Sequence, residues 1–178
     1  LIHLAGLSRP MKIHAKDINQ SIDKNIIGTA NITKVCSKFN IKLVYMSTCY
    51  VYPGTKGNYS EESSLKPINK YAWSKLGGEC AVSMYKNSRI LRITMCEKPF
   101  LHKYAFHDIN TNFIFHEEVA KIIPKILDKK GVINVGGKTQ SVYSFAKKYN
   151  KNVKKKSGKK LFPLNPSMNI SKLKKIIK

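Results

Sequence analysis

Short apolar runs alternate with longer segments of helical periodicity in the first part of the chain, and this order constrains the fold most. The runs expected to form strands are 1–5, 41–46 and 89–93. Between them, apolar residues recur at helical spacing over about 18–39 and 69–86. A chain that alternates strand and helix in this way forms a parallel sheet covered by helices. The sequence therefore predicts an α/β fold.

Each of these segments also has a predicted buried side. The run 1–5 is apolar at nearly every position, which predicts a strand buried on both faces. The apolar stripe of the first helix consists of Ile18, Ile22, Ile26, Ala30, Val35, Cys36 and Phe39. The apolar stripe of the second helix consists of Ala72, Leu76, Cys80 and Met84. We expect both stripes to face the core.

A smaller second part follows these elements. It is expected to contain a helix at 117–128, a strand at 132–135 and a short helix at 142–148. The lysine-rich segment 151–160 is expected to be a solvated basic link.

The formal net charge of +23 raises the question of a nucleic-acid partner. Of the 33 basic residues only Arg9, Arg89 and Arg92 are arginine, the side chain that reads base edges through bidentate contacts. Abundant lysine, asparagine and isoleucine also result from A/T-rich coding without any selected ligand. We therefore expect weak, salt-sensitive binding to polyanions and no specific nucleic-acid partner.

The cysteines carry information on compartment and metals. Cys36, Cys49, Cys80 and Cys96 form no Cys-x-x-Cys pair and no cluster with histidine at metal-ligand spacing. We expect free thiols in a reducing, cytoplasmic setting, and no metal site. No apolar run approaches the roughly 18 residues that a membrane-spanning helix needs, so no membrane partner is expected.

Three residues are candidates for acid–base chemistry. Tyr71 and Lys75 stand four residues apart, on one face of the second helix. A neighbouring ammonium favours the phenolate, so we expect the pKa of Tyr71 to lie below its usual value near 10. The spacing alone is weak evidence because lysine is so common here. Thr48 follows the strand 41–46, at the edge where parallel sheets bind ligands, and could hydrogen-bond the same substrate oxygen.

Several ordered motifs surround these residues. They are Ser-Thr-x-Tyr-Val at 47–51, Gly-Thr-Lys-Gly-x-Tyr with acids after it at 54–62, Pro-x-Asn-x-Tyr-x-x-Ser-Lys-x-x-x-Glu at 67–79, and shorter stretches at 91–93, 113–120, 135–137 and 167–173. With these motifs the chain resembles the extended short-chain dehydrogenase/reductases over nearly its whole length. Within them it looks most like the dTDP-4-dehydrorhamnose reductases and related nucleotide-sugar epimerases and dehydratases.

The resemblance implies a Rossmann-type sheet, NAD or NADP as cofactor, and a nucleotide-linked sugar as substrate. Carried over residue by residue, Thr48, Tyr71 and Lys75 are the catalytic residues. The implied cofactor-binding residues are Ala5, Gly6, Asn25, Ser47, Tyr71 and Lys75. From the residues alone, Asn25 also suits a solvated helix position, and Ser47 a hydrogen-bonding position at a strand end.

Two departures from the family pattern leave alternatives open. The family's opening strand, glycine-rich turn and helix, which bind the pyrophosphate, do not occur in this sequence. We therefore expect an amino-terminally truncated chain that lacks the first βαβ half and is inactive alone, with NAD and NADP both open. The segment between Arg92 and His116 is shorter than in many relatives, which leaves the sugar undefined.

On this basis we predict two parts and one main activity. Residues 1–100 are expected to form a partial dinucleotide-binding Rossmann domain with the catalytic helix, and residues 101–178 a small substrate-binding region. The implied activity is hydride transfer at a sugar carbonyl. The alternatives are an epimerase or dehydratase with the same catalytic residues, and a non-catalytic polyanion-binding protein. The resemblance also implies a homodimer that pairs through the helix carrying Tyr71.

Overall fold

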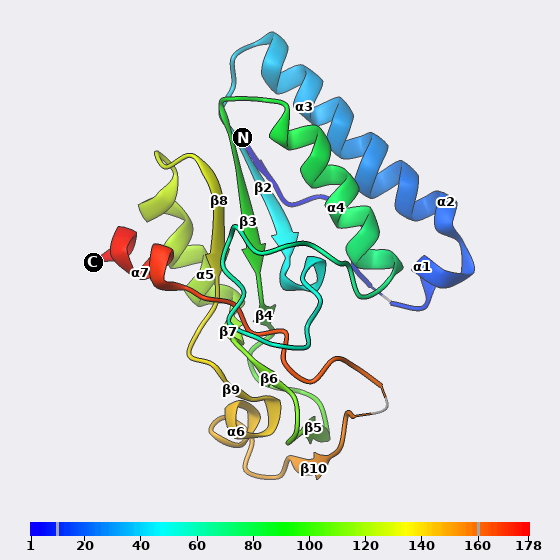
Figure 1. Ribbon diagram of the computed structural model, residues 1–178, viewed down its shortest axis with the longest axis vertical. Coiled ribbons are helices and arrows are strands. Elements are labelled where there is room, and N and C mark those ends of the chain that lie inside the picture. The colour runs from blue at the N-terminus through cyan, green and yellow to red at the C-terminus, as the bar shows by residue number, and fades with distance from the viewer. Residues whose placement is uncertain (10, 160) are drawn as a thin grey trace.

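The computed structural model describes residues 1–9, 11–159 and 161–178, and its centre is a four-stranded parallel sheet (Figure 1). The strand order is β1-β2-β3-β8, with bounds Ile2–His3, Leu43–Thr48, Ser88–Ile93 and Gly131–Val135. The register pairs Thr48 with Ile93, and Ile93 with Val135, so the carboxyl ends of these three strands share one edge. The predicted α/β fold with a Rossmann-type parallel sheet is confirmed.

One face of the sheet is covered by a layer of helices that lie side by side in Figure 1. The layer consists of α1 (Ile13–Lys16), α2 (Ile18–Ser21), a π-helical turn (Ile22–Ile27), α3 (Gly28–Lys38) and α4 (Lys70–Ser83). The predicted helix at 18–39 is thus present as a continuous helical segment that contains one π-helical turn. Such turns are frequent at functional sites.

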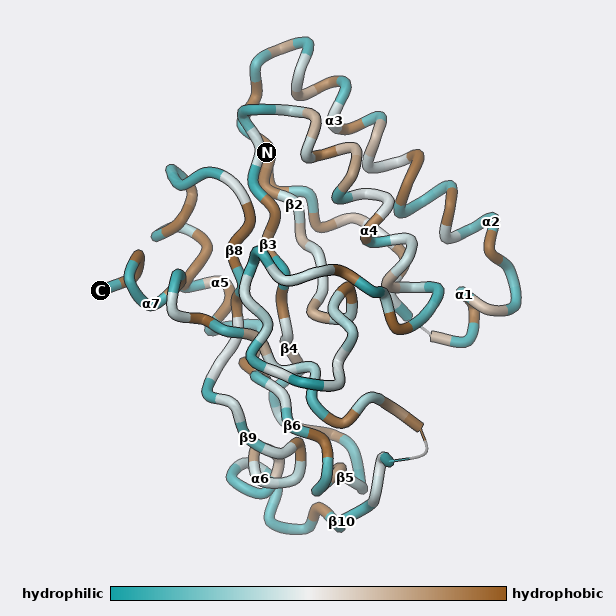
Figure 2. Tube along the Cα trace, viewed as in Figure 1, coloured by the Kyte–Doolittle hydropathy of each residue, from teal (hydrophilic) through white to brown (hydrophobic). Residues whose placement is uncertain are grey.

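The predicted buried stripes of this layer are only partly right, because Cys36 and Ala72 are fully buried but several other members are exposed. Phe39 is 62% exposed and Met84 is 89% exposed, and Ile18, Ile22, Val35 and Cys80 are exposed as well. In Figure 2, hydrophobic residues occur at intervals along α2 and α3. The buried side of α2, the π-helical turn and α3 is mostly polar, with Ser21, Asn25, Thr29, Thr33 and Cys36. These polar side chains are buried because they find hydrogen-bond partners within the fold.

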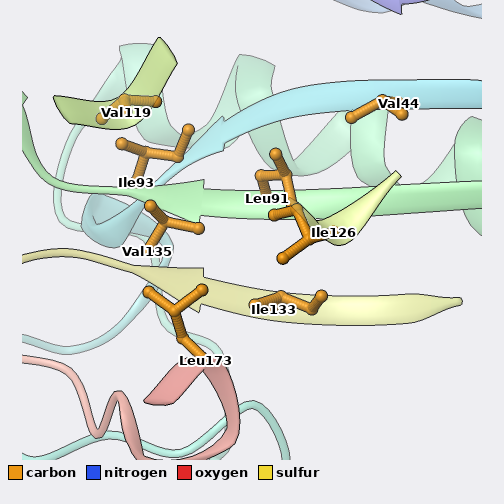
Figure 3. Packing of buried hydrophobic residues seen from close by; sticks show 8 residues of the cluster. All are labelled: Val44, Leu91, Ile93, Val119, Ile126, Ile133, Val135 and Leu173. Carbon is orange, nitrogen blue, oxygen red and sulfur yellow. The ribbon is translucent and has the colours of Figure 1, made fainter. Parts of the chain in front are cut away.

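The opposite face of the sheet carries the apolar core. It is covered by α5 (His116–Ile122), a 3-10 turn (Ile123–Ile126) and α7 (Ser171–Ile177). Figure 3 shows the buried cluster, which consists of Val44, Leu91, Ile93, Val119, Ile126, Ile133, Val135 and Leu173. The β-branched and leucine side chains of β3 and β8 supply half of it, as the strand patterns predict.

The first strand differs from its prediction. His3 is buried, but Leu1, Ile2 and Leu4 are exposed, so the expectation of a strand buried on both faces is wrong. The physical reason is position, because among the described residues β1 pairs only with β2 and forms the edge of the sheet.

The lower part of the molecule in Figure 1 contains short strands and one helix around a second apolar cluster. The strand pairs are β4 (Met95–Cys96) with β7 (Ile114–Phe115), β5 (Tyr104–Phe106) with β10 (Lys154–Lys156), and β6 (Asn110–Thr111) with β9 (Gln140–Ser141). The helix is α6 (Val142–Lys147). The basic link predicted at 151–160 contains the strand β10, whose three lysines are all exposed.

The boundary near residue 100 stays a prediction. Strand β8 and helices α5 and α7 follow that residue in sequence but lie on the central sheet, whereas β5, α6 and β10 form the lower part. In the described ranges, no helix has the length and apolar character required to cross a membrane. The four cysteines carry free thiols, and Cys36 and Cys49 are buried.

Candidate active site

The predicted catalytic residues lie where β2 ends and α4 begins. Thr48 is the last residue of β2, and its buried hydroxyl accepts a hydrogen bond from the Tyr50 amide at 3.3 Å. Helix α4 begins where the Asn69 side chain accepts a hydrogen bond from the Ala72 amide at 2.8 Å. The asparagine of the Pro-x-Asn-x-Tyr motif is therefore a helix cap, which places Tyr71 in the first turn of α4.

The pKa of Tyr71 does not follow the prediction. Burial raises it to about 12, the thiol of Cys49 adds to this shift, and the hydroxyl of Thr48 and the charge of Arg9 oppose it. The predicted lowering by Lys75 is wrong, because desolvation of the phenolate dominates and Lys75 is not among the groups that shift Tyr71. In the chain as it stands, Tyr71 is a neutral phenol at pH 7.

Lys75 is a buried ammonium one turn further along α4. Its side chain is only 7% exposed, and its Nζ lies 4.2 Å from the centroid of the Tyr45 ring. Burial lowers the pKa of Lys75 to about 8, while the charge of Glu79 opposes the shift. Within the described ranges Nζ forms no hydrogen bond, so its donors are available to a bound group.

Asn25 connects the loop after β1 to the catalytic helix. Its Nδ2 donates to the carbonyl of Leu7 and to Ser74 Oγ, both at 2.8 Å, and its Oδ1 accepts from the Leu7 amide at 2.7 Å. A side chain at Gly6 would place its Cβ 3.0 Å from Asn25 Oδ1, so glycine allows this close approach. The alternative of a solvated Asn25 is wrong, because this residue is 1% exposed.

Ser47, Glu79 and Arg92 form a buried cluster behind the catalytic residues. Ser47 Oγ donates to Glu79 Oε1 at 2.5 Å, and Arg92 Nη2 donates to Glu79 Oε2 at 2.8 Å. Ser47 is thus a hydrogen-bonding residue at a strand end, and its predicted cofactor contact stays a prediction. The cluster joins β2, α4 and β3, and so fixes the position of α4 relative to the sheet. Glu79 is the last residue of the motif at 67–79, so the sequence indicated that it belongs to the site. Arg92 lies in the short stretch 91–93, which does not indicate an ion pair with Glu79.

His14 is a site residue that the sequence did not reveal. Its ring is 1% exposed and lies 5.1 Å from the ring of Tyr71, centroid to centroid. Its Nδ1 and Ser21 Oγ are 2.7 Å apart, and burial lowers the pKa of His14. A lone histidine in α1 carries no pattern that points to a contact with a tyrosine more than fifty residues away.

A cavity of about 470 Å³ lies between the end of the sheet and the lower part of the molecule. Its lining includes the basic residues Arg9, His102, Lys103 and Lys156, and the aromatic residues Tyr50, Phe100, Tyr104, Phe106, Phe113 and Phe162. Arg9 also forms an ion pair with Glu97. Aromatic surfaces beside a few cations suit a ligand that contains a planar ring and negative charge.

Thr48, Tyr71, Lys75, Asn25 and Ser47 therefore lie in one region. The exposed Ala5 and Gly6 border it, and a Cβ at Gly6 would lie 3.9 Å from Lys75 Nζ. This arrangement offers a hydroxyl, a neutral phenol and an unpaired ammonium at the carboxyl edge of a parallel sheet, which is where such sheets bind ligands. Their catalytic and cofactor-binding roles stay predictions.

Comparisons with known sequences agree on one family. The model of the RmlD substrate binding domain matches residues 2–96. The methionine adenosyltransferase 2 subunit beta of Xenopus laevis is 35% identical over 82 residues, which cover 46% of this chain and 24% of that relative. A dTDP-4-keto-6-deoxy-D-glucose reductase of Streptomyces niveus is 41% identical over 56 residues, which cover 31% of this chain and 19% of that relative. The chain therefore matches about a quarter or less of the length of these proteins.

Solved structures are similar over much more of the chain. A hypothetical dTDP-4-dehydrorhamnose reductase from Sulfolobus tokodaii superposes with a TM-score of 0.85 at 26% identity, covering 98% of this chain and 72% of that one. The dTDP-4-dehydrorhamnose reductase from Bacillus anthracis, solved in complex with NADP, gives a TM-score of 0.85 at 22% identity, covering 97% and 72%. The second likeness concerns the fold alone.

Proposed function

The chain belongs to the RmlD substrate binding domain family, and on this premise we propose that it acts in the NAD(P)-dependent reduction of a nucleotide-linked sugar, as a dTDP-4-dehydrorhamnose reductase does. The observation that carries the proposal is the contact of Thr48 with Tyr71 at the carboxyl end of β2, with Lys75 one turn further along α4. The names of the Sulfolobus tokodaii and Streptomyces niveus relatives support a sugar-nucleotide reductase. The Bacillus anthracis structure supports a nicotinamide dinucleotide as cofactor.

The residues present fit the nicotinamide ribose end of a dinucleotide. Asn25 holds the backbone of Gly6 and Leu7 close to α4, and glycine at position 6 leaves room for a ligand to approach the main chain. Lys75 Nζ is a donor without a partner among the described residues, so it would hold the ribose hydroxyls. When bound, the nicotinamide supplies the hydride.

The chain's own residues would transfer the proton to the substrate. Tyr71 donates its phenolic proton to the substrate oxygen, and Thr48 Oγ1 orients that oxygen by a hydrogen bond. The basic and aromatic side chains of the cavity would hold the diphosphate and the base of the substrate.

The neutral phenol of Tyr71 is compatible with the proton donor of a reductase. An epimerase needs Tyr71 to begin as a base that removes a proton from a sugar hydroxyl. Burial keeps Tyr71 protonated at pH 7, which suits the proton donor of a reduction. An epimerase or dehydratase is the alternative, because the similar proteins also include one named as a UDP-glucose epimerase and one named as a dTDP-glucose 4,6-dehydratase.

The test is a coupled assay of hydride transfer. The chain, joined to the amino-terminal glycine-rich segment of a dTDP-4-dehydrorhamnose reductase, is incubated with a dTDP-4-keto-6-deoxy sugar and NADPH or NADH, and oxidation of the cofactor is followed by its absorbance. The Tyr71→Phe variant should lose at least about a hundredfold in kcat, because its general acid is gone. Tyr85→Phe is the matched control, since Tyr85 is a buried tyrosine just beyond α4 in a different cluster. No oxidation of either cofactor, or equal rates for all three proteins, would refute the reductase proposal.

Non-catalytic polyanion binding is the second candidate, and one observation favours it. The three lysines of β10 are all exposed, next to a chain end that contains no acidic residue after Asp128. We expect binding to DNA to be weak, indifferent to sequence, and largely lost between about 50 and 200 mM salt. Tight, sequence-dependent binding at physiological salt in a fluorescence assay would favour this candidate over the reductase.

A further inference from the structure

Lys75 lies over a side chain that its sequence motif does not contain. Tyr45, in the middle of β2, is fully buried, and its ring faces the ammonium at 4.2 Å from Nζ to the ring centroid. An ammonium at this distance from an aromatic face is attracted by the electron density of the ring. The attraction is strongest where water is excluded, and Lys75 is almost completely buried.

The same tyrosine also holds the main chain of α4. Its hydroxyl donates to the carbonyl oxygen of Lys75 at 3.2 Å. Gly78 makes this contact possible, because a Cβ there would lie 2.3 Å from the Tyr45 hydroxyl. A glycine inside a helix costs about 1 kcal/mol relative to alanine, so α4 loses helix stability where Tyr45 approaches it.

From this geometry we propose that Tyr45 is a positioning residue for Lys75, with its ring holding the ammonium and its hydroxyl holding the helix at the same residue. The inference rests on the proposed function, since Lys75 has a cofactor to bind only in an enzyme of this kind. The link to Tyr45 itself does not depend on any reaction. Tyr45 thereby keeps Nζ close to the backbone of Gly6, where it could meet a ribose hydroxyl.

The other titratable groups around Lys75 do not replace this contact. On its own helix, the carboxylate of Glu79 is held by Arg92 and Ser47, and Tyr71 is a neutral phenol. From β1, His3 has its pKa lowered by burial and by the charge of Lys75. His3 is therefore a neutral ring at pH 7 and does not repel the ammonium, and the ring of Tyr45 is the group that directly faces it.

Competitive labelling measures the state of Lys75 without any turnover. The full protein is treated with a trace of acetic anhydride at a series of pH values, and mass spectrometry of the peptides gives the labelling midpoint of each lysine. Lys70, exposed on the same helix, is the reference for access of the reagent. Tyr45→Phe keeps the ring and should leave the Lys75 midpoint unchanged. Tyr45→Leu removes the ring and should lower the midpoint by about one unit.

A second set of variants keeps the shape of the side chain constant. Trifluorinated phenylalanine placed at position 45 has nearly the size of phenylalanine but little electron density on its face. The Lys75 labelling midpoint should therefore be lower in this variant than in Tyr45→Phe, while the two variants have equal melting temperatures. An unchanged midpoint in the fluorinated variant would overturn the proposal. A lowered midpoint in a protein without reductase activity would keep the contact and refute the proposed function instead.

Kinetics then test positioning in a reductase. Tyr45→Phe loses only the hydroxyl that anchors the helix, so KM for the cofactor should rise several-fold with kcat nearly unchanged. The fluorinated variant should shift the pH profile of kcat/KM in the same direction as the labelling midpoint. A purely structural role for Tyr45 predicts lower melting temperatures with no shift of the pH profile, and that result would contradict the proposal.

Discussion

The two faces of the central sheet are built from different chemistry. The face under α5 and α7 buries a continuous aliphatic cluster (Figure 3). The face under α2, α3 and α4 buries an apolar cluster at one end, but toward the carboxyl edge it buries hydrogen-bonding and charged side chains, namely Ser21, Asn25, Thr29, Ser47, Lys75, Glu79 and Arg92. The aliphatic face stabilises the sheet by removing apolar surface from water. The polar face holds side chains in fixed positions at a cost in desolvation.

The difference teaches which substitutions should affect stability and which should affect function. On the aliphatic face, each side chain contributes through its volume, and loss of volume should cost stability alone. On the polar face, most side chains form a hydrogen bond or an ion pair, so the effect of a substitution depends on whether the other member of that pair is left buried without a partner. The following variants test this contrast.

The largest effect is expected from Arg92→Met. This change leaves the carboxylate of Glu79, 3% exposed, without its cation, and Ser47 remains as a hydrogen-bond donor to it. Breaking a buried ion pair on one side costs about 3–5 kcal/mol. The free energy of unfolding, measured with urea, should fall by this amount.

The double variant Arg92→Met with Glu79→Met is the matched control. It removes both charges and should recover much of the loss, since an apolar pair of similar volume can replace a buried ion pair. If the single variant is as stable as the wild type, the pair does not hold α4 to the sheet and the contrast between the faces is wrong.

Leu91→Ala on the aliphatic face should follow in size. Leu91 is fully buried in the cluster of Figure 3, and loss of its methyl groups leaves a cavity that costs about 2–5 kcal/mol. At a temperature where the variant is fully folded, kcat should stay within about twofold of the wild type. A large fall in kcat with little change in stability would show that this face also serves the reaction.

The contrast between the faces also explains what the sequence could predict. Alternating strands and helices follow from local apolar runs. The parallel sheet and the continuous helical segment at 18–38 were therefore predictable. The buried side of that layer was not, because a hydrophobic stripe indicates the core only where the core is apolar. Asn25 and Thr29 are buried through partners on other elements, and sequence spacing does not show these partners.

The candidate site was predictable to a similar degree. Thr48, Tyr71 and Lys75 stand in motifs with a recognisable order, and the structure places Thr48 beside Tyr71, with Lys75 one turn further along α4. The contacts that surround them, such as Tyr45 under Lys75 and His14 beside Tyr71, arise from the three-dimensional packing. The raised pKa of Tyr71 likewise depends on burial, which the helical spacing of Tyr71 and Lys75 does not reveal.

A smaller effect of opposite sign is expected from Lys75→Met. The folded chain lowers the pKa of Lys75 from 10.5 to about 8, so burial of the ammonium costs stability wherever it is charged. This cost is fully present below about pH 8 and disappears as the pH rises toward 10.5, where the lysine is neutral in both states. At pH 7 the variant should be more stable than the wild type by about 1–3 kcal/mol.

Urea titrations at several pH values measure this difference directly. The gap between Lys75→Met and the wild type should narrow between pH 8 and 10.5, while Lys70→Met, at an exposed position on the same helix, should show no gap. A variant that is less stable than the wild type at pH 7 would mean that Lys75 contributes to stability and that the polar face does not trade stability for function.

The smallest effect is expected at the stripe that the sequence assigned to the core. Met84 follows α4 and is 89% exposed, so Met84→Lys should change the free energy of unfolding by less than about 0.5 kcal/mol. Val82, two residues earlier, is fully buried, and Val82→Lys should unfold much of the protein because it buries an unpaired charge. The two variants add the same side chain to the same helix end and differ only in the face that receives it. A loss above about 2 kcal/mol for Met84→Lys that depends on protein concentration would show that a second copy covers this side of α4. The hydrophobic stripe would then be buried between two subunits. Contacts with the second copy would in that case help to stabilise the helices that cover the polar face of the sheet.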